Sequence, residues 1–280
     1  MKPPLFSILI VTWNNENDVE ECIQSFLNST YTNFNITVVD SASSDTTLEI
    51  VREKFPMVKI LPLPENKYYT GALNFGIGYI QETFAPKYIL YLNADTVAEP
   101  DMLEELLNVA EDFGMGNGDN LLAVGPKVKF FEQRNEIYSL GIDYDGFLNA
   151  CQIGHGEVDK GQFDKSTTVF GIEGTCVMLV AKNLKKFGTK PFWEKLKMYS
   201  EDVEFFIRAR KFGLVAITAP KAVIYHKVMA STKQNLTFKV KEQKMHNWLL
   251  IALRHYKFKS KLAILKKYIL WKFLFIREKL

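Results

Sequence analysis

Two acidic stretches hold residues whose types and spacing could do chemistry. The apolar run Tyr88–Leu92 stops at Asn93–Asp95, and a carboxylate at the end of a buried strand needs either solvent or a positively charged partner. Glu201 and Asp202 stand side by side at the start of a predicted helix, where the helix dipole favours an ionised carboxylate, as a general base requires. Each feature also has an ordinary explanation, because acids are common in turns and in first helical turns.

His226 could complete a metal site with Asp95. A carboxylate oxygen is the kind of ligand that Mg²⁺ or Mn²⁺ accepts, and a histidine at the end of a predicted strand can add a nitrogen ligand. A single histidine is more often structural, so the metal site depends on whether the fold brings the two side chains together.

Polar residues follow four predicted strands, at the point where each strand ends. They occupy residues 12–14, 40–41, 66–71 and 93–95. Because ligands of doubly wound sheets bind beyond the carboxyl ends of the strands, we expect the four groups to line one crevice. The sequence has neither GxGxxG after the first strand nor GxxxxGK[ST], so we expect a metal to neutralise any bound phosphate.

The elements that position these residues alternate between strands and helices. Apolar runs at 6–11, 36–40, 58–63 and 88–92 predict buried strands, and helical spacing follows each of them. This order predicts an α/β fold with a mostly parallel central sheet flanked by helices, extended after about residue 112 by mixed, partly antiparallel strands. The predicted late strands are 214–218 and 222–226, the predicted helix caps are Asp45, Thr70 and Ser200, and the C-terminal helices occupy 237–280.

Composition and charge bound the class of protein. Of the 280 residues 47% are hydrophobic, and the three widely spaced cysteines suit reduced thiols in the cytoplasm. We expect no signal peptide and no spanning helix, since no stretch reaches about 18 uninterrupted apolar residues. Residues 233–280 carry 13 Lys or Arg against 2 acids, about +11, and the remainder sums to about −8. This asymmetry predicts a basic surface-binding appendage and no nucleic-acid partner.

Seven stretches of the sequence, taken in their order along the chain, resemble those of a known family. They are "SILIVTWNNENDVEECIQSF", "VVDSASSDTTLEIV", "ENKYYTGALNFGI", "YLNADT", "GTCVML", "YSEDVEFFIRARKFG" and "APKAVIYHKVMAST". Over roughly residues 5–232 the chain resembles an inverting glycosyltransferase of family 2 with the nucleotide-sugar transferase fold GT-A, closest to the rhamnosyltransferase-like members. No QxxRW motif follows the paired acids, which argues against a processive synthase. Tyr68 stands where the family usually has a glycine.

The resemblance implies a role for each candidate residue. Asp95 would be the metal-binding acid of the family's DxD motif, with Asn93 in its first position and His226 joining the metal site. Asp202 would be the catalytic base, with Glu201 beside it. The donor-binding residues would be Thr12, Trp13, Asn14, Asp40, Ser41, Asn66, Gly71, Asn74, Asn93 and Ala94, with Thr12, Asn14 and Asp40 at the base and ribose, and Gly174 and Thr175 would border the acceptor.

These roles predict a metal-dependent, inverting transfer of a sugar. The donor would be a nucleoside-diphosphate sugar, and the acceptor would be a hydroxyl of a glycan or lipid-linked glycan. The expected division is a GT-A domain at 1–232 and a basic helical extension at 233–280. One alternative is a sugar-1-phosphate nucleotidyltransferase, although "VTWNNEND" lacks the glycines and arginines that such an enzyme needs after its first strand. The other alternative is a non-catalytic nucleotide-sugar-binding module.

The end of the chain, 257–280, has the pattern of a basic amphipathic helix. Lysines and Arg277 interrupt its apolar residues too often for a spanning helix. We expect the segment to bind an anionic membrane surface, which would place a cytoplasmic enzyme on the inner face of the plasma membrane. The alternative is a helix that packs on the catalytic body or on a second copy in a homo-oligomer.

Overall fold

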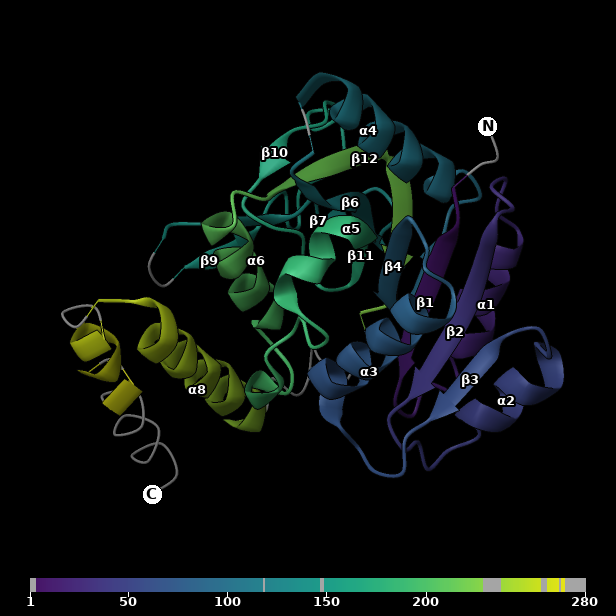
Figure 1. Cartoon of the computed structure of the whole chain (residues 1–280), viewed down its shortest axis with the longest axis horizontal. Helices are drawn as coiled ribbons and strands as arrows, with labels where there is room; N and C mark the ends of the chain where they lie inside the picture. The colour runs from purple at the N-terminus through teal and green to yellow at the C-terminus, as the bar shows by residue number, and fades with distance from the viewer. Residues whose placement is uncertain are drawn as a thin grey trace.

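The computed structural model of the chain describes residues 4–117, 119–146, 149–228, 238–257, 261–266 and 268–269. In this part of the chain a ten-stranded mixed sheet forms the centre, and helices cover both of its faces (Figure 1). The α/β fold with a central sheet flanked by helices is thus confirmed. No helix among the described residues is long and apolar enough to cross a membrane.

The first half of the sheet is parallel, as the alternating pattern predicts. Strand β1 (Phe6–Thr12) pairs in parallel with β2 (Phe34–Asp40) on one side and with β4 (Tyr88–Asn93) on the other, and β3 (Lys59–Pro62) extends the sheet beyond β2. The connecting helices are α1 (Val19–Leu27), α2 (Thr47–Lys54) and α3 (Tyr68–Thr83).

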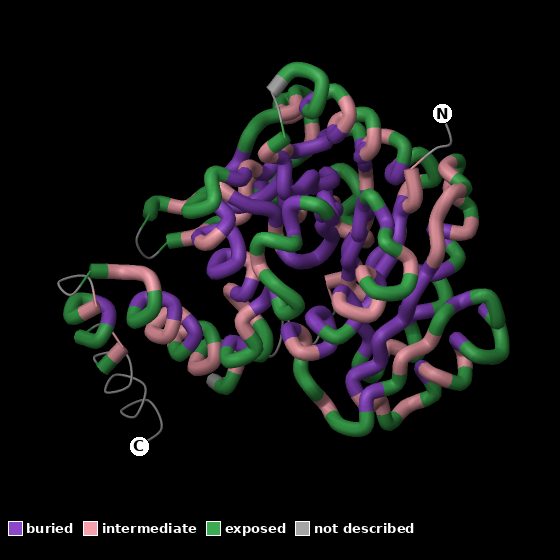
Figure 2. Tube along the Cα trace, viewed as in Figure 1, coloured by how far each residue is buried: buried purple, intermediate pink, exposed green. Residues whose placement is uncertain are grey.

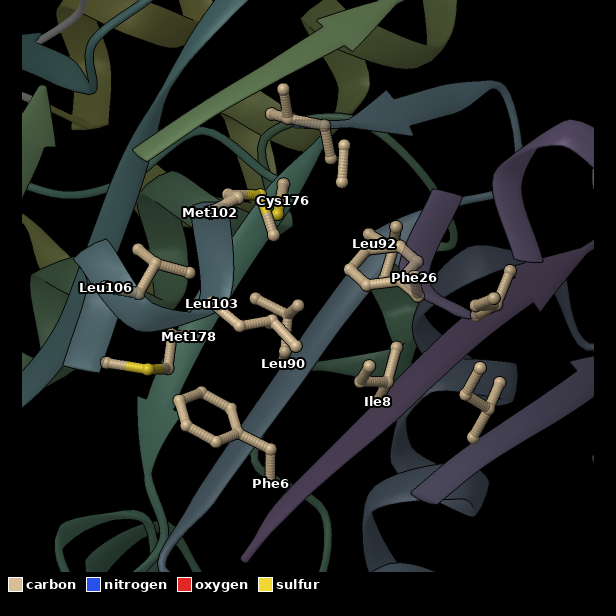
Figure 3. Close-up of a cluster of buried hydrophobic side chains, with 14 of the residues drawn as sticks. Phe6, Ile8, Phe26, Leu90, Leu92, Met102, Leu103, Leu106, Cys176 and Met178 are labelled. Carbon is tan, nitrogen blue, oxygen red and sulfur yellow. The ribbon is translucent and has the colours of Figure 1, made fainter. Parts of the chain in front are cut away.

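Strand β1 is buried along its whole length because helices cover it on both faces. Its side chains alternate between two core clusters, with Phe6 and Ile8 in the cluster that includes α1 and Leu9 in the cluster that includes α3. Figure 3 shows part of the first cluster, where Phe6 and Ile8 lie near Leu90 of β4. The central strands are accordingly buried along most of their length (Figure 2).

The second half of the sheet mixes directions. Helix α4 (Met102–Asn117) leads from β5 (Thr96–Ala98) to β6 (Leu121–Phe130), and β11 (Cys176–Val180) lies antiparallel between β4 and β6. The smaller elements are β7 (Ile137–Ser139), β8 (Ile142–Tyr144), β9 (Ala150–Gln152), β10 (Thr168–Val169), α5 (Ala181–Leu184), η1 (Lys185–Phe187) and η2 (Glu194–Leu196). The last strand in the sequence is β12 (Val215–His226), which lies between β6 and β10. The order along the sheet is β3-β2-β1-β4-β11-β6-β12-β10, with β5 beside β12 and β7 beside β6.

Two local predictions were wrong. The expected strands at 214–218 and 222–226 are one strand, β12, whose parallel pairing with β6 shifts register between Ala219 and Val223. The break in hydrophobic pattern around Pro220 marks this bulge and not a turn. Ser200 precedes helix α6 (Glu201–Lys211) in the left-handed conformation, and its side chain makes no capping bond.

The other two predicted caps differ as well. Thr70 lies within α3, which begins at Tyr68. Asp45 stands just before α2, where its carboxylate accepts hydrogen bonds from the backbone N–H of Thr47 at 3.1 Å and from the Thr47 hydroxyl at 2.6 Å. Asp45 therefore supports the start of α2, although Thr46 occupies the cap position.

Helix α8 (Phe238–His255) packs against the side of the molecule that carries α6 (Figure 1). Ile251 of α8 is fully buried in a cluster with Leu196 and with Val203 and Ile207 of α6. The division of the chain near residue 232 remains a prediction, but α8 shares a core cluster with α6. Most of the predicted membrane helix 257–280 lies outside the described residues.

Candidate active site

A pocket of about 560 Å³ lies at the carboxyl ends of the parallel strands. Its wall includes residues from all four polar groups that follow β1, β2, β3 and β4. The four polar groups, which are separate in the sequence, thus contribute to one pocket, as the sequence predicts. The lining residues are Val11, Thr12, Trp13, Asn15, Ser41, Asn66, Tyr68, Tyr69, Asn93, Ala94, Asp95, Lys197, Met198, Tyr199, Lys239, Val240 and Gln243.

Asp40 and Asn14 organise the loops under this pocket and are not part of its lining. Strands β1 and β2 are in register, so Thr12 stands opposite Asp40 and its hydroxyl donates a 2.8 Å hydrogen bond to the carboxylate. The Ser43 backbone N–H and hydroxyl also donate to Asp40. Asn14 accepts from the Ser44 N–H at 2.8 Å. The expectation that Asp40 and Asn14 contact the nucleotide therefore stays a prediction, while Thr12 does reach the wall.

Ser41 and Asn66 join the second and third strand ends. The Ser41 hydroxyl donates to Asn66 Oδ1 at 3.1 Å, and the same oxygen accepts from the Tyr68 N–H at 2.7 Å. Tyr68 adopts a positive φ of 56°, the conformation that suits the glycine usual at this position. A Cβ atom on Gly71 would lie 2.8 Å from Lys67 Cβ, so Gly71 lets the loop approach the helix start.

Asn74 does not face the pocket. It is buried on α3, and its amide donates to the Phe192 carbonyl at 2.8 Å and accepts from the Phe192 N–H at 2.9 Å. Asn74 thus holds the segment that leads into α6. Its predicted contact with the donor is not seen in the wall of the pocket.

Asp95 and His226 meet at the edge of the pocket. Asp95 lies in the turn between β4 and β5, and β12 pairs with β5 so that His226 stands opposite Thr96. His226 Nε2 is 3.2 Å from Asp95 Oδ2. Burial opposes charge on both groups, but their contact outweighs burial, so the pKa of Asp95 is lowered and the pKa of His226 is raised.

Asp95 and His226 could supply two of the ligands of a divalent cation. Asp95 Oδ1 and His226 Nδ1 are buried without a protein partner. Within the described residues no cluster of three or more His, Cys, Asp or Glu side chains is arranged to hold a metal. A cation here would take its other ligands from water or from a bound anion, as Mg²⁺ commonly does.

A group of carboxylates surrounds Gly174, next to the pocket. The Gly174 N–H donates to Asp202 Oδ2 at 3.2 Å, and a Cβ atom on Gly174 would lie 3.5 Å from Glu201 Oε1. Burial raises the pKa of both carboxyl groups. The negative charge of Asp202 raises the pKa of Glu201 further, and that of Glu173 raises the pKa of Asp202 further. A base with a raised pKa is better matched to proton transfer near neutral pH.

Gly174 and Thr175 connect the carboxylates with the end of β4. The Thr175 carbonyl accepts from the Asn93 N–H at 3.0 Å. Tyr69 lines the pocket, and its hydroxyl donates to the Gly174 carbonyl at 2.9 Å. Glu201, Asp202, Gly174 and Thr175 are not among the lining residues, so the carboxylates are linked to the wall through Gly174 and Tyr69.

Sequence reasoning missed part of this wall. Lys197, Met198 and Tyr199 come from the loop before α6, and they carry no motif that marks them as lining residues. Tyr69 lies within the predicted group 66–71, but the sequence does not distinguish it from its neighbours. A further group comes from α8, which the sequence predicts to be an appendage, and comprises Lys239, Val240 and Gln243. Glu173, beside the predicted acceptor residues, was missed as the third carboxylate.

Comparison with known proteins decides the family. The sequence model described as "Glycosyl transferase family 2" matches residues 7–188, more than half of the chain. The chain belongs to glycosyl transferase family 2. An uncharacterised glycosyltransferase of Haemophilus influenzae is 25% identical over 229 residues, which are 80% of this chain and 66% of that protein. A chondroitin synthase of Pasteurella multocida is 31% identical over 107 residues, 36% of this chain and 10% of that one.

Solved structures confirm the GT-A fold of this glycosyltransferase. GalNAc-T7 in complex with UDP, GalNAc and Mn²⁺ aligns with a TM-score of 0.62 at 14% identity, covering 80% of this chain and 44% of its own. The mannosyltransferase PcManGT of Pyrobaculum calidifontis, with GDP-Man and Mn²⁺, aligns with a TM-score of 0.61 at 18% identity, covering 93% and 68%. The chain spans two thirds or less of the length of the curated relatives that it matches here.

The family match covers only part of the site of this glycosyltransferase. Residues 7–188 include the four strand ends, Asp95 and Gly174. Asp202, His226 and the whole of α8 lie beyond the match, so their place in the site comes from the geometry alone.

Proposed function

We propose that this glycosyltransferase moves a sugar from a nucleoside diphosphate to a hydroxyl group of a glycan or lipid-linked glycan, with inversion and with the help of a divalent metal. The observation that carries the proposal is the arrangement around the pocket. Asp95 lines the pocket and pairs with His226, and the carboxylates of Glu201 and Asp202 lie beside Gly174, whose carbonyl accepts from the lining residue Tyr69.

Asp202 would act as the general base. As the acceptor oxygen forms its bond to the anomeric carbon, the bond from that carbon to the diphosphate oxygen breaks and the acceptor proton passes to Asp202. A positioned carboxylate typically contributes about 10²–10⁴-fold to such a step. A base on the face opposite the leaving group gives a single displacement, and therefore inversion. The Gly174 and Val203 N–H groups, at 3.2 and 2.7 Å, hold the carboxylate in place.

Asp95 and His226 would hold the metal, with Asn93 and Ala94 beside them in the wall. When bound, a divalent cation supplies Lewis-acid stabilisation of the negative charge on the leaving diphosphate. Structural neighbours support this class of donor and cofactor. One is a complex with GDP-Man and Mn²⁺, and others are complexes with UDP or UDP-GlcNAc. The choice between Mg²⁺ and Mn²⁺ and the rhamnosyltransferase-like specificity remain predictions.

Thr12, Trp13, Ser41 and Asn66 would contact the donor from the part of the wall that follows β1, β2 and β3. Trp13 and Tyr68 are exposed by 53% and 48% and offer aromatic faces at the pocket. Such faces can stack on a nucleobase. Gly174 and Thr175 would border the acceptor, close to the base.

A panel of nucleotide sugars tests the proposal. The full-length protein is incubated with each donor in Mn²⁺, in Mg²⁺ and in excess chelator, and release of nucleoside diphosphate is measured. We expect slow hydrolysis of one donor class with metal, and little without it. Thermal-shift binding of a donor with no nucleoside diphosphate released in any condition, even with glycan acceptors added, would favour a non-catalytic binding module.

A further inference from the structure

Asn247 of α8 is buried against the loop before α6, although it lies outside the family match. Its side chain is fully buried, and its Nδ2 lies 2.9, 2.8 and 2.6 Å from the backbone carbonyl oxygens of Leu196, Met198 and Tyr199. The amide group has two hydrogens, so the three carbonyls share them. Gln243 donates to Asn247 Oδ1 at 2.8 Å and fixes the orientation of the amide.

The loop that these carbonyls belong to is unfavourable on its own. Lys197, Tyr199 and Ser200 all have positive φ angles, of 60°, 73° and 63°, although none of them is a glycine. Side chains other than glycine disfavour this conformation, so the surrounding structure must hold it. The unusual backbone turns the carbonyls of Leu196, Met198 and Tyr199 toward Asn247, which donates to all three.

The same loop connects the two halves of the site. Lys197, Met198 and Tyr199 line the pocket. Ser200 precedes Glu201 and Asp202 directly, and the Ser200 side chain makes no capping bond that would fix the start of α6. The loop 196–200 therefore leads directly into the helix turn that carries the two carboxylates.

The loop is also held from the opposite side. Thr70 of α3 donates to the Lys197 carbonyl from its backbone N–H at 2.9 Å and from its hydroxyl at 3.1 Å. Asn247 thus holds the carbonyls of residues 196, 198 and 199, and Thr70 holds the one between them. The two buried side chains fix the loop between α3 and α8.

We propose that Asn247 is a positioning residue: it fixes the loop 196–200, and through that loop it sets the pocket wall and the carboxylates of Glu201 and Asp202. The inference rests on the proposed function of Asp202 as the base. It makes α8 a required part of the active site and not an appendage.

Asn247→Ala in the full-length protein tests the inference, and Asn183→Ala is the matched control. Asn183 is also a buried asparagine whose Nδ2 donates to two backbone carbonyls, those of Asp119 and Leu121, both at 2.8 Å, but outside the pocket. Both variants should lower thermal stability. Hydrogen–deuterium exchange of peptides covering 192–204 should accelerate only in Asn247→Ala.

Turnover of the donor found in the panel is the second readout. Because small displacements of a reacting group can cost about 10²-fold, we expect kcat to fall by at least about 10-fold in Asn247→Ala and to stay near wild type in Asn183→Ala. Thr70→Val, which keeps the backbone bond to Lys197, should give a smaller loss. Asn247→Gln retains both amide donors and should recover part of the loop protection, and it replaces the alanine variant if that variant does not fold.

Exchange in 192–204 that matches the Asn183→Ala control would overturn the inference, whatever the activity. Accelerated exchange with unchanged kcat would also overturn it, because the loop would then not position the base. If the wild-type protein turns over no donor, the proposed transfer reaction fails, and the exchange data alone decide whether Asn247 holds the loop.

Discussion

Asp95 and Asp202 are both acids beside one pocket, and their surroundings give them different properties. Asp95 faces His226, whose hydrogen bond and charge lower the pKa of Asp95 against the effect of burial. Burial and the negative charge of Glu173 raise the pKa of Asp202. An acid held ionised suits a cation ligand, and an acid with a raised pKa suits proton transfer.

Asp95→Ala should weaken the binding of UDP in the presence of Mn²⁺. Without the carboxylate a cation loses a charged ligand, and the diphosphate charge is less well neutralised. We expect a loss of at least about 10-fold in affinity by calorimetry, the scale of effect typical for a metal-site residue. Asp101→Ala, an exposed acid at the start of α4, is the control. Equal affinity of the Asp95 and Asp101 variants, with and without chelator, would make Asp95 a turn residue.

The raised pKa of the Glu201–Asp202 pair predicts the pH dependence of activity. Asp202 must be ionised to accept a proton, so kcat/KM should rise with pH through a value above the ordinary carboxyl range of about 4. A pH profile with its acid limb near pH 4 would contradict the assignment.

The same shift predicts the pH dependence of stability. The folded protein binds protons that the unfolded chain has released, so the contribution of the pair is fully present below about pH 4 and is lost as pH rises through the folded-state pKa values. Asp202→Asn should flatten this part of the stability curve, measured by urea unfolding at several pH values. A curve as steep as that of wild type would show that other groups cause the slope.

At the scale of elements, the approach of α3 to β1 brings Asn66 and Tyr69 to the pocket. Gly76 makes that approach possible, because a Cβ atom there would lie 2.4 Å from Leu9 Cδ1. Gly78, two residues along the same helix, faces open space. The two glycines therefore form a matched pair.

Gly76→Ala should destabilise the fold by about 1–3 kcal/mol, since overpacking forces the core to shift. Gly78→Ala should be neutral or stabilising by up to about 1 kcal/mol, because alanine is the better helix former. Urea denaturation of the two variants gives the comparison. A Gly76→Ala protein as stable as Gly78→Ala would show that α3 can move away from β1 without cost.

Much of the framework could be predicted from the sequence, because it depends on local patterns. Continuous apolar runs located β1, β2, β3 and β4, and polar residues after each located the crevice. The bulge that joins 214–226 into one strand could not be predicted, since it depends on pairing with β6. Nor could the left-handed loop 197–200, because its conformation is fixed by Thr70 and Asn247, which are distant in sequence.

At the scale of the whole molecule, α8 joins the basic end of the chain to the catalytic body. It contributes Lys239, Val240 and Gln243 to the pocket and buries Ile251. Lys239, one of the basic residues of 233–280, thus lies at the pocket. Among the residues described beyond α8, three apolar side chains are exposed, Leu262, Leu265 and Ile269.

We propose that this end of the chain binds anionic membranes, where a lipid-linked acceptor would be found. The intact protein should sediment with vesicles that contain anionic lipid and should be released by high salt, because each nearby Lys or Arg contributes about 1 kcal/mol before screening. Reversing Lys261 and Lys266 to Glu in the full chain should reduce sedimentation at low salt. Equal binding to anionic and neutral vesicles, or none to either, would favour a packing or oligomerisation role.

The most direct test of the catalytic arrangement is Asp202→Asn, compared with the exposed Asp101→Asn. The substitution keeps the shape of the side chain and removes the proton acceptor, and it leaves one oxygen in place of the two that accept from Gly174 and Val203. With the donor found in the panel, kcat should fall by at least about 10²-fold while affinity for the donor stays within a few-fold of wild type. Near-normal kcat in Asp202→Asn would contradict the assignment of Asp202 as the base.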